Sequence, residues 1–190
     1  MILTPSRLDE LWMTAAQDFK IQQIREEWLW LMDQTVNRWN QRGNILEIGC
    51  YDGGSTSFLG HFAQNMVTVD MHRKPRFDPS KIMAKNYAYV GGDSHAPAQI
   101  RQFGRYSWDF VLIDGDHSYE GVKVDFENVL PHLRPGIPVA FHDIVISRSH
   151  HEQGCFVGEF WNDLKLRYPQ ADFTEIRTHN DWAGIGIIRL

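Results

Sequence analysis

The feature that most restricts the fold of this chain is a regular alternation of short apolar runs with amphipathic stretches. The apolar runs have the length and composition of strands, and they lie at 44–49, 66–70, 87–93, 108–114 and 136–143. Helical spacing is found between and after them, at 55–64, from Pro97, at 118–133 and at 157–168. Strands that alternate with helices predict an α/β fold whose parallel sheet has helices on both faces.

The end of the chain departs from this alternation. Two β-type runs, 172–178 and 184–190, are joined by a short polar loop, which predicts an antiparallel hairpin. The expected sheet therefore has seven strands and is mostly parallel. Ser55 and Thr56 are residue types that cap helices, so we expect them to begin the helix at 55–64.

The first part of the chain, from about Leu8 to Gln41, contains no Pro or Gly and shows helical spacing, which predicts two helices or one broken helix. Its tryptophans are more typical of packing, or of a dimer surface, than of a cofactor-binding box; they include Trp12, Trp28, Trp30 and Trp39. No linker or repeat interrupts the sequence. We expect one domain, 1–190, with residues 1–42 as a helical cap that contributes to substrate binding or dimerisation.

Composition narrows the classes of partner. The formal net charge of −5 provides no electrostatic basis for binding nucleic acid. No apolar run approaches the ~20 residues of a membrane span, and the N-terminus lacks the pattern of a signal peptide. The two cysteines, Cys50 and Cys155, form no disulfide framework, which favours a reducing compartment. We therefore expect a cytoplasmic protein whose partner is a small molecule.

Acidic residues recur at the carboxyl ends of the five expected parallel strands. These residues are Glu47, Asp70, Asp93, the pair Asp114 and Asp116, and Asp143. In open α/β sheets, ligands bind beyond the carboxyl ends of the strands, near the point where the strand order reverses. The acidic residues therefore predict a ligand site along one edge of the sheet.

The loop after the first strand, "GCYDGGS", narrows the ligand. It lacks the Lys of a phosphate-binding P-loop, and Tyr51 and Asp52 interrupt the G-x-G-x-x-G pattern of dinucleotide sites. Asp70, however, follows Gly49 at the offset of roughly 20 residues where a carboxylate binds ribose hydroxyls. A ribose without a pyrophosphate, beside several carboxylates, favours a positively charged nucleoside. S-adenosylmethionine, with its ammonium and sulfonium groups, fits this description.

Two segments carry a resemblance to a known family. "EIGCYDGGS" (47–55) resembles motif I of class I S-adenosylmethionine-dependent methyltransferases, and its Tyr-for-Gly variant is similar to that of metal-dependent O-methyltransferases acting on catechols and caffeoyl-CoA. "FVLIDGDHSYEGVKVDFENVLPHLRPGIPVAFHD" (110–143) resembles small bacterial methyltransferases related to cephalosporin-hydroxylase-like and macrolide-sugar O-methyltransferases. The resemblance implies a Rossmann-like fold, with residues 43–190 as the cofactor-binding core.

The resemblance also implies roles for individual residues. Gly49 and Gly53 would let the backbone approach the methionine moiety, Asp70 would hold the ribose, and Asp93 and Ser94 would meet the adenine. The full set expected to bind the cofactor is Glu47 (beneath the loop), Gly49, Tyr51, Gly53, Ser55, Asp70, Asp93, Ser94 and Asp114. Asp93 has an alternative as the cap of the next helix, and Cys50 is interpreted as a packed residue rather than a nucleophile.

A second group of residues is expected at the ends of the fourth and fifth strands. In metal-dependent relatives, the positions of Asp114, His142 and Asp143 bind a divalent metal. The His-Asp pair departs from the Asp-Asn or Glu-Asp of those relatives, and imidazole favours Mn, Fe, Co, Ni or Zn over Mg. The alternative is that His142 and Asp143 only line the substrate pocket. His150 and His151 are interpreted as part of a solvated loop or a substrate lid, and metal ligation is the alternative.

His117 occupies the position where catechol-type relatives place a base lysine, so His117 and Asp114 are the predicted catalytic residues. The sequence thus predicts a methyltransferase of the EC 2.1.1 class that methylates an oxygen of a small hydroxylated molecule or a sugar, with a metal (Mg, Mn or another transition metal) as a candidate aid. Two alternatives stay open: a nucleotide-dependent oxidoreductase, and a non-catalytic binding subunit with the same fold.

Overall fold

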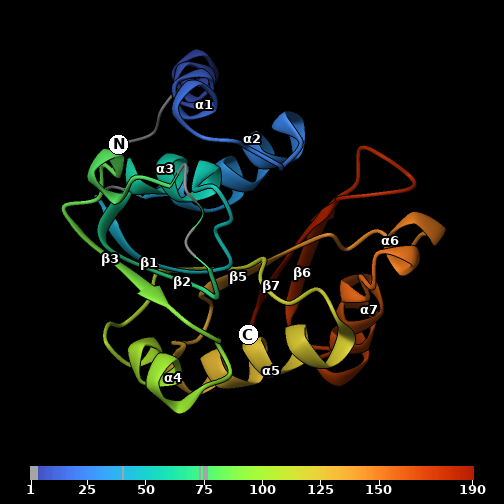
Figure 1. The fold of residues 1–190 in the computed structure, drawn as a ribbon. Coiled ribbons are helices and arrows are strands. Elements are labelled where there is room, and N and C mark those ends of the chain that lie inside the picture. The colour runs from blue at the N-terminus through green and yellow to red at the C-terminus, as the bar shows by residue number, and fades with distance from the viewer. Residues whose placement is uncertain (1–3, 40, 73, 75–76) are drawn as a thin grey trace.

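The computed structural model of the chain describes residues 4–39, 41–72, 74 and 77–190. At its centre lies a seven-stranded sheet with the order β3-β2-β1-β4-β5-β7-β6 (Figure 1). The strands are β1 (Gly43–Ile48), β2 (Ala63–Asp70), β3 (Asn86–Gly91), β4 (Phe110–Ile113), β5 (Pro138–His142), β6 (Asp172–Ile176) and β7 (Ile185–Arg189).

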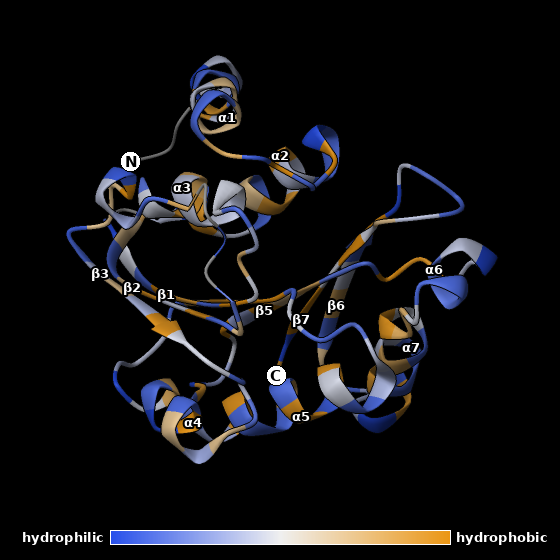
Figure 2. Cartoon of the chain, in the orientation of Figure 1, coloured by the Kyte–Doolittle hydropathy of each residue, from blue (hydrophilic) through white to orange (hydrophobic). Residues whose placement is uncertain are grey.

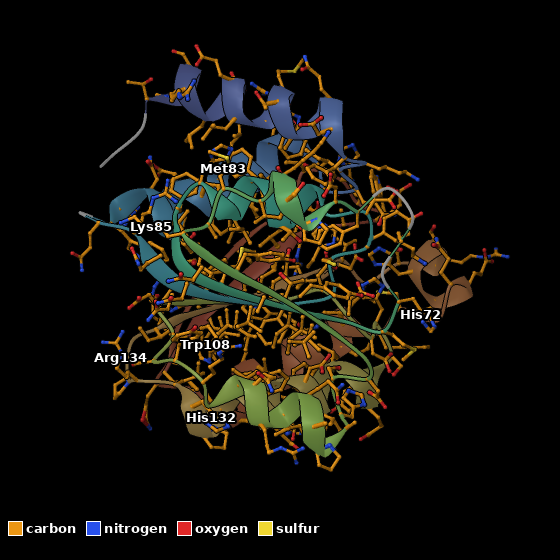
Figure 3. All side chains as sticks on the ribbon, turned by 60° about the vertical axis from the view of Figure 1, so that its left-hand side comes forward. His72, Met83, Lys85, Trp108, His132 and Arg134 are labelled. Carbon is orange, nitrogen blue, oxygen red and sulfur yellow. The ribbon has the colours of Figure 1, made fainter. Side chains whose placement is uncertain are left out.

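Strands β1 to β5 pair in parallel, and β7 pairs antiparallel with both β5 and β6. The predicted mostly parallel, seven-stranded sheet with a C-terminal antiparallel hairpin is therefore confirmed. The strand order reverses between β1 and β4, which lie side by side. Figure 3 shows that His72, which follows β2, lies on the opposite side of the molecule from Lys85 and Arg134, which precede β3 and β5. The parallel strands thus end along one common edge.

Helices form a layer on each face of the sheet (Figure 1). One layer contains α1 (Pro5–Asp18), α2 (Arg25–Gln34) and α3 (Gly54–Gly60), and the other contains α4 (Pro97–Phe103), α5 (Tyr119–Val129) and α7 (Val157–Arg167). A further short α-helix is α6 (Arg148–Glu152), and three 3₁₀-helices are labelled η1 (Val36–Arg38), η2 (Pro79–Lys81) and η3 (Leu130–His132). The expectation of helices on both faces is confirmed.

The central strands β1, β4, β5 and β7 are mostly buried and apolar because both of their faces are covered, whereas the edge strands β3 and β6 are partly exposed. Successive residues of β1 show this: Ile45 packs into the core on the side of α1 to α3, while Leu46 packs into the core on the side of α5 and α7. Figure 2 shows hydrophobic residues along the central strands and hydrophilic residues on α6 and the loop between β6 and β7. The sheet thus divides the hydrophobic core into two layers.

Several details differ from the sequence-based expectations. The N-terminal segment forms two helices, and residues 1–3 and 40 of the expected cap lie outside the described part of the chain. The prediction that Ser55 and Thr56 cap a helix was wrong, because α3 begins after Gly53, whose left-handed backbone (φ 87°) makes the turn. The His-rich segment, expected as a loop, contains α6.

The tryptophans of the N-terminal segment contribute to the core. Trp28 is buried, and Trp12, Trp30 and Trp39 are partly buried against the same apolar cluster. This agrees with the packing interpretation. Within the described residues, no helix has both the length and the apolar character needed to cross a membrane.

Candidate active site

A cleft opens where the strand order reverses, beyond the carboxyl ends of β1 and β4. Its volume is about 390 Å³. Ligand sites of open α/β sheets lie at this position. Residues from four strand ends line it, and they include Gly49, Tyr51, Ser55, Asp70, Asp93, Ser94, Asp114 and His117. The structure thus brings to one cleft most of the residues that were expected to bind a cofactor.

Glu47 lies behind this cleft rather than in it. Its carboxylate is fully buried and accepts hydrogen bonds from the hydroxyls of Thr56 (2.6 Å) and Thr68 (3.0 Å). Burial raises the pKa of Glu47 from 4.5 to about 7, although the hydrogen bonds partly oppose the shift. Glu47 therefore links β1 to α3 and β2 beneath the loop, which is where the resemblance placed it. The hydroxyl of Thr56 makes this contact instead of capping a helix.

Asp70 shapes the loop that follows β1. One carboxylate oxygen accepts the backbone N–H groups of Cys50 (2.8 Å) and Tyr51 (2.9 Å), and the other accepts the N–H of His72 (2.9 Å). Three backbone donors that would otherwise lack a partner in the turn are thus satisfied by one side chain. Asp70 also lines the cleft, so it can accept further hydrogen bonds there.

The glycines of the loop make room for the protein's own chain. A Cβ atom on Gly49 (φ 84°) would lie 2.0 Å from the carbonyl oxygen of Asp114, and a Cβ atom on Gly53 would lie 2.2 Å from the ring of Phe77. The missing side chains thus allow close packing of the loop against the end of β4 and against Phe77. Contact of these glycines with a methionine moiety stays a prediction.

Tyr51 forms one wall of the cleft and is exposed. Its backbone has a positive φ of 49°, which is uncommon for a residue with a side chain. The ammonium groups of Lys20 and Lys74 lie 5.5 Å and 5.2 Å from the ring centroid, within the range of cation–π contacts. The neighbouring Cys50 is buried, and burial raises the pKa of its thiol, which agrees with a packed residue rather than a nucleophile.

The loop after β3 lies at the other end of the cleft. Asp93 accepts a hydrogen bond from the N–H of His95 (2.9 Å), which closes an Asx turn. Helix α4 begins after Ala96 and has no side-chain cap, so the capping alternative for Asp93 was wrong. Behind the loop, His95 Nε2 lies 3.3 Å from a carboxylate oxygen of the buried Asp125. Burial raises the pKa of Asp125 to about 6.

A second cavity, of about 430 Å³, adjoins the first. The two share Lys20, Gln22, Asp114 and His117 as lining residues. The second cavity is further lined by Ile21, His142, Asp143, His150, Gln153, Cys155 and Trp182. Asp114 and His117 therefore stand at the junction of the two cavities.

Two carboxylates and two imidazoles meet at this junction. Asp114 Oδ1 lies 3.2 Å from His117 Nε2 and 3.4 Å from His142 Nδ1. Asp143 completes the group, because its Oδ1 lies 3.1 Å from His142 Nδ1 and its Oδ2 lies 3.7 Å from His117 Nε2. The sequence predicted this proximity, since β4 and β5 are neighbours.

The four groups shift one another's pKa values. Burial alone raises the pKa of Asp114 and Asp143, but the charges and hydrogen bonds of His142 and His117 together outweigh it and hold both pKa values below their usual range. Burial likewise opposes the charged form of His142, but the two carboxylates raise its pKa well above the usual value. The pKa of His117 is also raised, because its contact with Asp114 outweighs burial.

The donor set fits a divalent cation. Asp114, His142 and Asp143 each offer one ligand atom, and these atoms lie within 4.8 Å of one another. Two ligand atoms bound at about 2.1 Å and at right angles would be about 3.0 Å apart, close to the observed separations of 3.1 Å and 3.4 Å. Asp143 also has a left-handed backbone (φ 64°), a strained conformation that occurs at functional sites. Cation binding itself stays a prediction.

The two other histidines of this region are engaged elsewhere. His150 Nδ1 donates to the carbonyl of Val145 (2.5 Å), and its Nε2 accepts the N–H of Ala183 (3.2 Å). Neither ring nitrogen of His150 is therefore free for a cation. His151 pairs with Glu159 at 2.5 Å on the outside of the site. These contacts argue against metal ligation by either residue, but the solvated-loop interpretation was wrong for His150, which is buried in α6.

Some residues at the junction were not expected. Gln23, between α1 and α2, donates from Nε2 to Asp114 Oδ2 at 2.9 Å. Cys155 offers a sulfur atom within 4.8 Å of ligand atoms of His117 and Asp143. Trp182 reaches the second cavity from the loop between β6 and β7. Gln23 lies 91 positions from Asp114, and no local pattern marks Gln23 or Trp182 as a site residue. Cys155 lies only 12 positions from Asp143 and next to the His-rich segment, which was a signal in the sequence.

Comparisons with known proteins agree with this geometry. Residues 46–144 match the family described as a methyltransferase domain. Demethylmacrocin O-methyltransferase from Streptomyces fradiae is 30% identical over 108 residues, which cover 51% of this chain and 26% of that protein. The uncharacterised protein y4gI from Sinorhizobium fredii is 39% identical over 67 residues, which cover 35% of this chain and 7% of that protein. The chain thus matches about a quarter or less of the length of these relatives.

Solved structures share the fold. An O-methyltransferase from Bacillus cereus in complex with SAH has a TM-score of 0.66 and 20% identity, with 100% of this chain and 93% of that chain covered. The MycE methyltransferase of mycinamycin biosynthesis, in complex with Mg, SAH and mycinamycin VI, has a TM-score of 0.67 and 19% identity, with 96% and 53% covered. Because the family match extends over more than half of its residues, this chain belongs to the methyltransferase domain family.

Proposed function

We propose that the protein is an S-adenosylmethionine-dependent methyltransferase that methylates a hydroxyl group of a small hydroxylated molecule or a sugar. The observation that carries this proposal is the pair of adjoining cavities that meet at Asp114 and His117. Transfer between two bound molecules needs two such compartments with one junction. The same activity is supported by membership of the methyltransferase domain family. It is also supported by the similar structures, which are complexes with SAH (S-adenosylhomocysteine).

In this proposal the first cavity holds the cofactor, which supplies an electrophilic methyl group on its sulfonium. Asp70 accepts hydrogen bonds from the ribose hydroxyls while it continues to hold the loop. The Asp93–Ser94 turn meets the adenine, and Tyr51, Ser55 and the backbone of Gly49 and Cys50 surround the methionine moiety. Glu47 acts from beneath, by fixing the strand that carries the loop.

The second cavity holds the acceptor. His117 is the proposed base, since it lies at the junction and its imidazole can take a proton from an acceptor hydroxyl. Asp114, His142 and Asp143 would hold a divalent cation, which would lower the pKa of a hydroxyl bound to it. The protein otherwise aligns the acceptor with the methyl group, and such positioning contributes on the order of 7–11 kcal/mol.

A cytoplasmic location, a homodimer and a substrate-binding role for residues 1–42 complete the proposal. Trp28 is buried and the neighbouring tryptophans pack on the core. A dimer contact would therefore involve apolar side chains that are exposed on α1, such as Met13. Analytical ultracentrifugation of the protein and of a Met13→Lys variant tests this contact. A monomeric wild-type protein would contradict it.

The test of the activity begins with binding. We expect calorimetric titration to detect binding of S-adenosylmethionine and S-adenosylhomocysteine but not of NAD. Binding of NAD alone would favour an oxidoreductase.

Transfer of a labelled methyl group to a panel of hydroxylated aromatic compounds and glycosides is then measured with Mg²⁺, with Mn²⁺ and with EDTA. Cofactor binding without transfer to any acceptor would favour the non-catalytic subunit. Undiminished transfer in EDTA would leave Asp114, His142 and Asp143 as pocket-lining residues.

A further inference from the structure

The segment that joins α1 to α2, residues 19–24, crosses the site; we call it the crossing segment. It is anchored at both ends, because Phe19 and Ile24 are buried. In between, it packs on the start of α3, where a Cβ atom on Gly54 would lie 2.7 Å from Ile21 Cγ1 and 2.8 Å from the carbonyl oxygen of Lys20. The crossing segment also lines both cavities.

Gln23 connects this segment to the cation site. Its Nε2 donates to Asp114 Oδ2 at 2.9 Å, across 91 positions of sequence. The other oxygen, Oδ1, faces His117 Nε2 and His142 Nδ1. The two oxygens of one carboxylate thus have separate partners, and rotation of the carboxylate would break the contact with Gln23.

We propose that Gln23 is a positioning residue of the cation site: it holds Asp114 so that only Oδ1 is offered to the cation, and it couples cation binding to the order of the crossing segment. The proposal rests on the cation site of the proposed function. A neutral amide suits this role, because it donates a hydrogen bond to the ligand without adding a charge that competes with the cation. Partners of this kind hold metal ligands in place, and their loss lowers metal affinity by about 10- to 100-fold.

The coupling acts in both directions. If the contact between Gln23 and Asp114 increases cation affinity, a bound cation must stabilise that contact by the same factor. The crossing segment carries Lys20, which is exposed and so accessible to trypsin. Cation binding is therefore expected to slow cleavage after Lys20.

The experiment compares Gln23→Met with Gln22→Met. Methionine has a similar length but no donor. Gln22 belongs to the same segment and lines the first cavity beside Gln23, but it makes no hydrogen bond to Asp114 among the described contacts. Affinity for Mn²⁺ is measured by calorimetry, and coordination is followed through the absorption bands of bound Co²⁺. We expect Gln23→Met to weaken Mn²⁺ binding about 10- to 100-fold and to alter the Co²⁺ spectrum, with Gln22→Met within twofold of wild type. Mn²⁺ should protect Lys20 from trypsin in wild type but not in Gln23→Met.

Equal Mn²⁺ affinity and spectra in wild type and Gln23→Met would overturn the proposal. Absence of Mn²⁺ and Co²⁺ binding by the wild type would overturn it as well, while binding of S-adenosylhomocysteine in the same preparation would leave the methyltransferase assignment standing. Thermal unfolding without cation identifies a folding defect in Gln23→Met; in that case Gln23→Leu provides the same comparison. A loss of affinity that Gln22→Met shares would assign the effect to packing of the segment and would also overturn the proposal.

Discussion

At one side of the cofactor cleft, Asp70 accepts three backbone N–H groups of its own loops. At the other side, Asp114 and Asp143 face the imidazoles of His117 and His142 across 3.1 to 3.7 Å. The first carboxylate is held by backbone N–H groups, which carry no proton that a cation could replace. The other two are paired with ionisable side chains, whose protons a cation can replace. Aspartates at different strand ends of the same sheet edge therefore differ in what they are arranged to bind.

Asp70→Ala gives the largest expected effect, because it removes both the ribose acceptor and the partner of the loop. Hydrogen bonds to a charged group contribute about 1.5–3 kcal/mol each, so loss of two ribose contacts predicts S-adenosylhomocysteine binding weaker by about 10²- to 10⁴-fold. Calorimetry measures the change. Asp70→Asn is the matched variant, since one amide oxygen can still accept the N–H groups of Cys50 and Tyr51. Affinity equal to wild type in Asp70→Ala would remove Asp70 from the cofactor site.

His117→Ala tests the other group in this comparison, the carboxylates and imidazoles around Asp114. Loss of a general base costs about 10²- to 10⁴-fold in rate, so turnover should fall by this amount while affinity for S-adenosylhomocysteine stays near wild type. His151→Ala is the control, because that imidazole lies outside the site and pairs with Glu159. A methyl-transfer assay and a binding titration on the same samples separate the two quantities. Near-normal turnover would leave His117 as a residue that only contacts Asp114.

The sequence predicted the sheet because the central strands are buried on both faces and are therefore apolar, as Ile45 and Leu46 of β1 illustrate. It also placed Asp114, His142 and Asp143 together, since adjacent strands of a parallel sheet end at the same edge. It could not predict contacts made by segments far apart in the chain. Glu27 of α2, for example, is fully buried and accepts the N–H groups of Thr178 (2.7 Å) and Gly184 (2.9 Å) near the C-terminus.

Local patterns failed where backbone conformation decided the outcome. Ser55 and Thr56 are good capping types, but the left-handed turn at Gly53 places them inside the first turn of α3, and Thr56 instead bonds Glu47. Likewise, nothing in the sequence tells that the space beside Gly49 is filled by the carbonyl of Asp114. Such contacts depend on the approach of two loops, which residue preferences alone do not determine.

Glu47→Gln tests how the buried carboxylate beneath the cofactor loop, on the same side of the cleft as Asp70, contributes to stability. The pKa of Glu47 is about 7 in the folded protein against an ordinary 4.5, so the folded state binds the proton more tightly. Its contribution to stability is thus complete below pH 4.5 and is lost as pH rises through 7, by about 3 kcal/mol. Urea unfolding from pH 5 to pH 8 should show a smaller decline in Glu47→Gln than in wild type. The exposed Glu120→Gln is the control, and parallel pH profiles of all three proteins would contradict the assignment.

The smallest expected effect separates charge from backbone at Asp143. Its left-handed backbone (φ 64°) is tolerated by Asp and Asn far better than by residues such as Ala, for which this conformation costs roughly 1–2 kcal/mol. Asp143→Asn and Asp143→Ala both remove the charge, so both should lose Mn²⁺ affinity. In EDTA, however, Asp143→Ala should be less stable to urea than Asp143→Asn by about 1 kcal/mol. Equal stabilities would show that the backbone relaxes and that only the charge matters. Wild-type Mn²⁺ affinity in Asp143→Asn would mean instead that the carboxylate of Asp143 pairs with imidazoles and does not bind a cation. The difference between Asp143 and Asp70 would then not be a difference in cation binding.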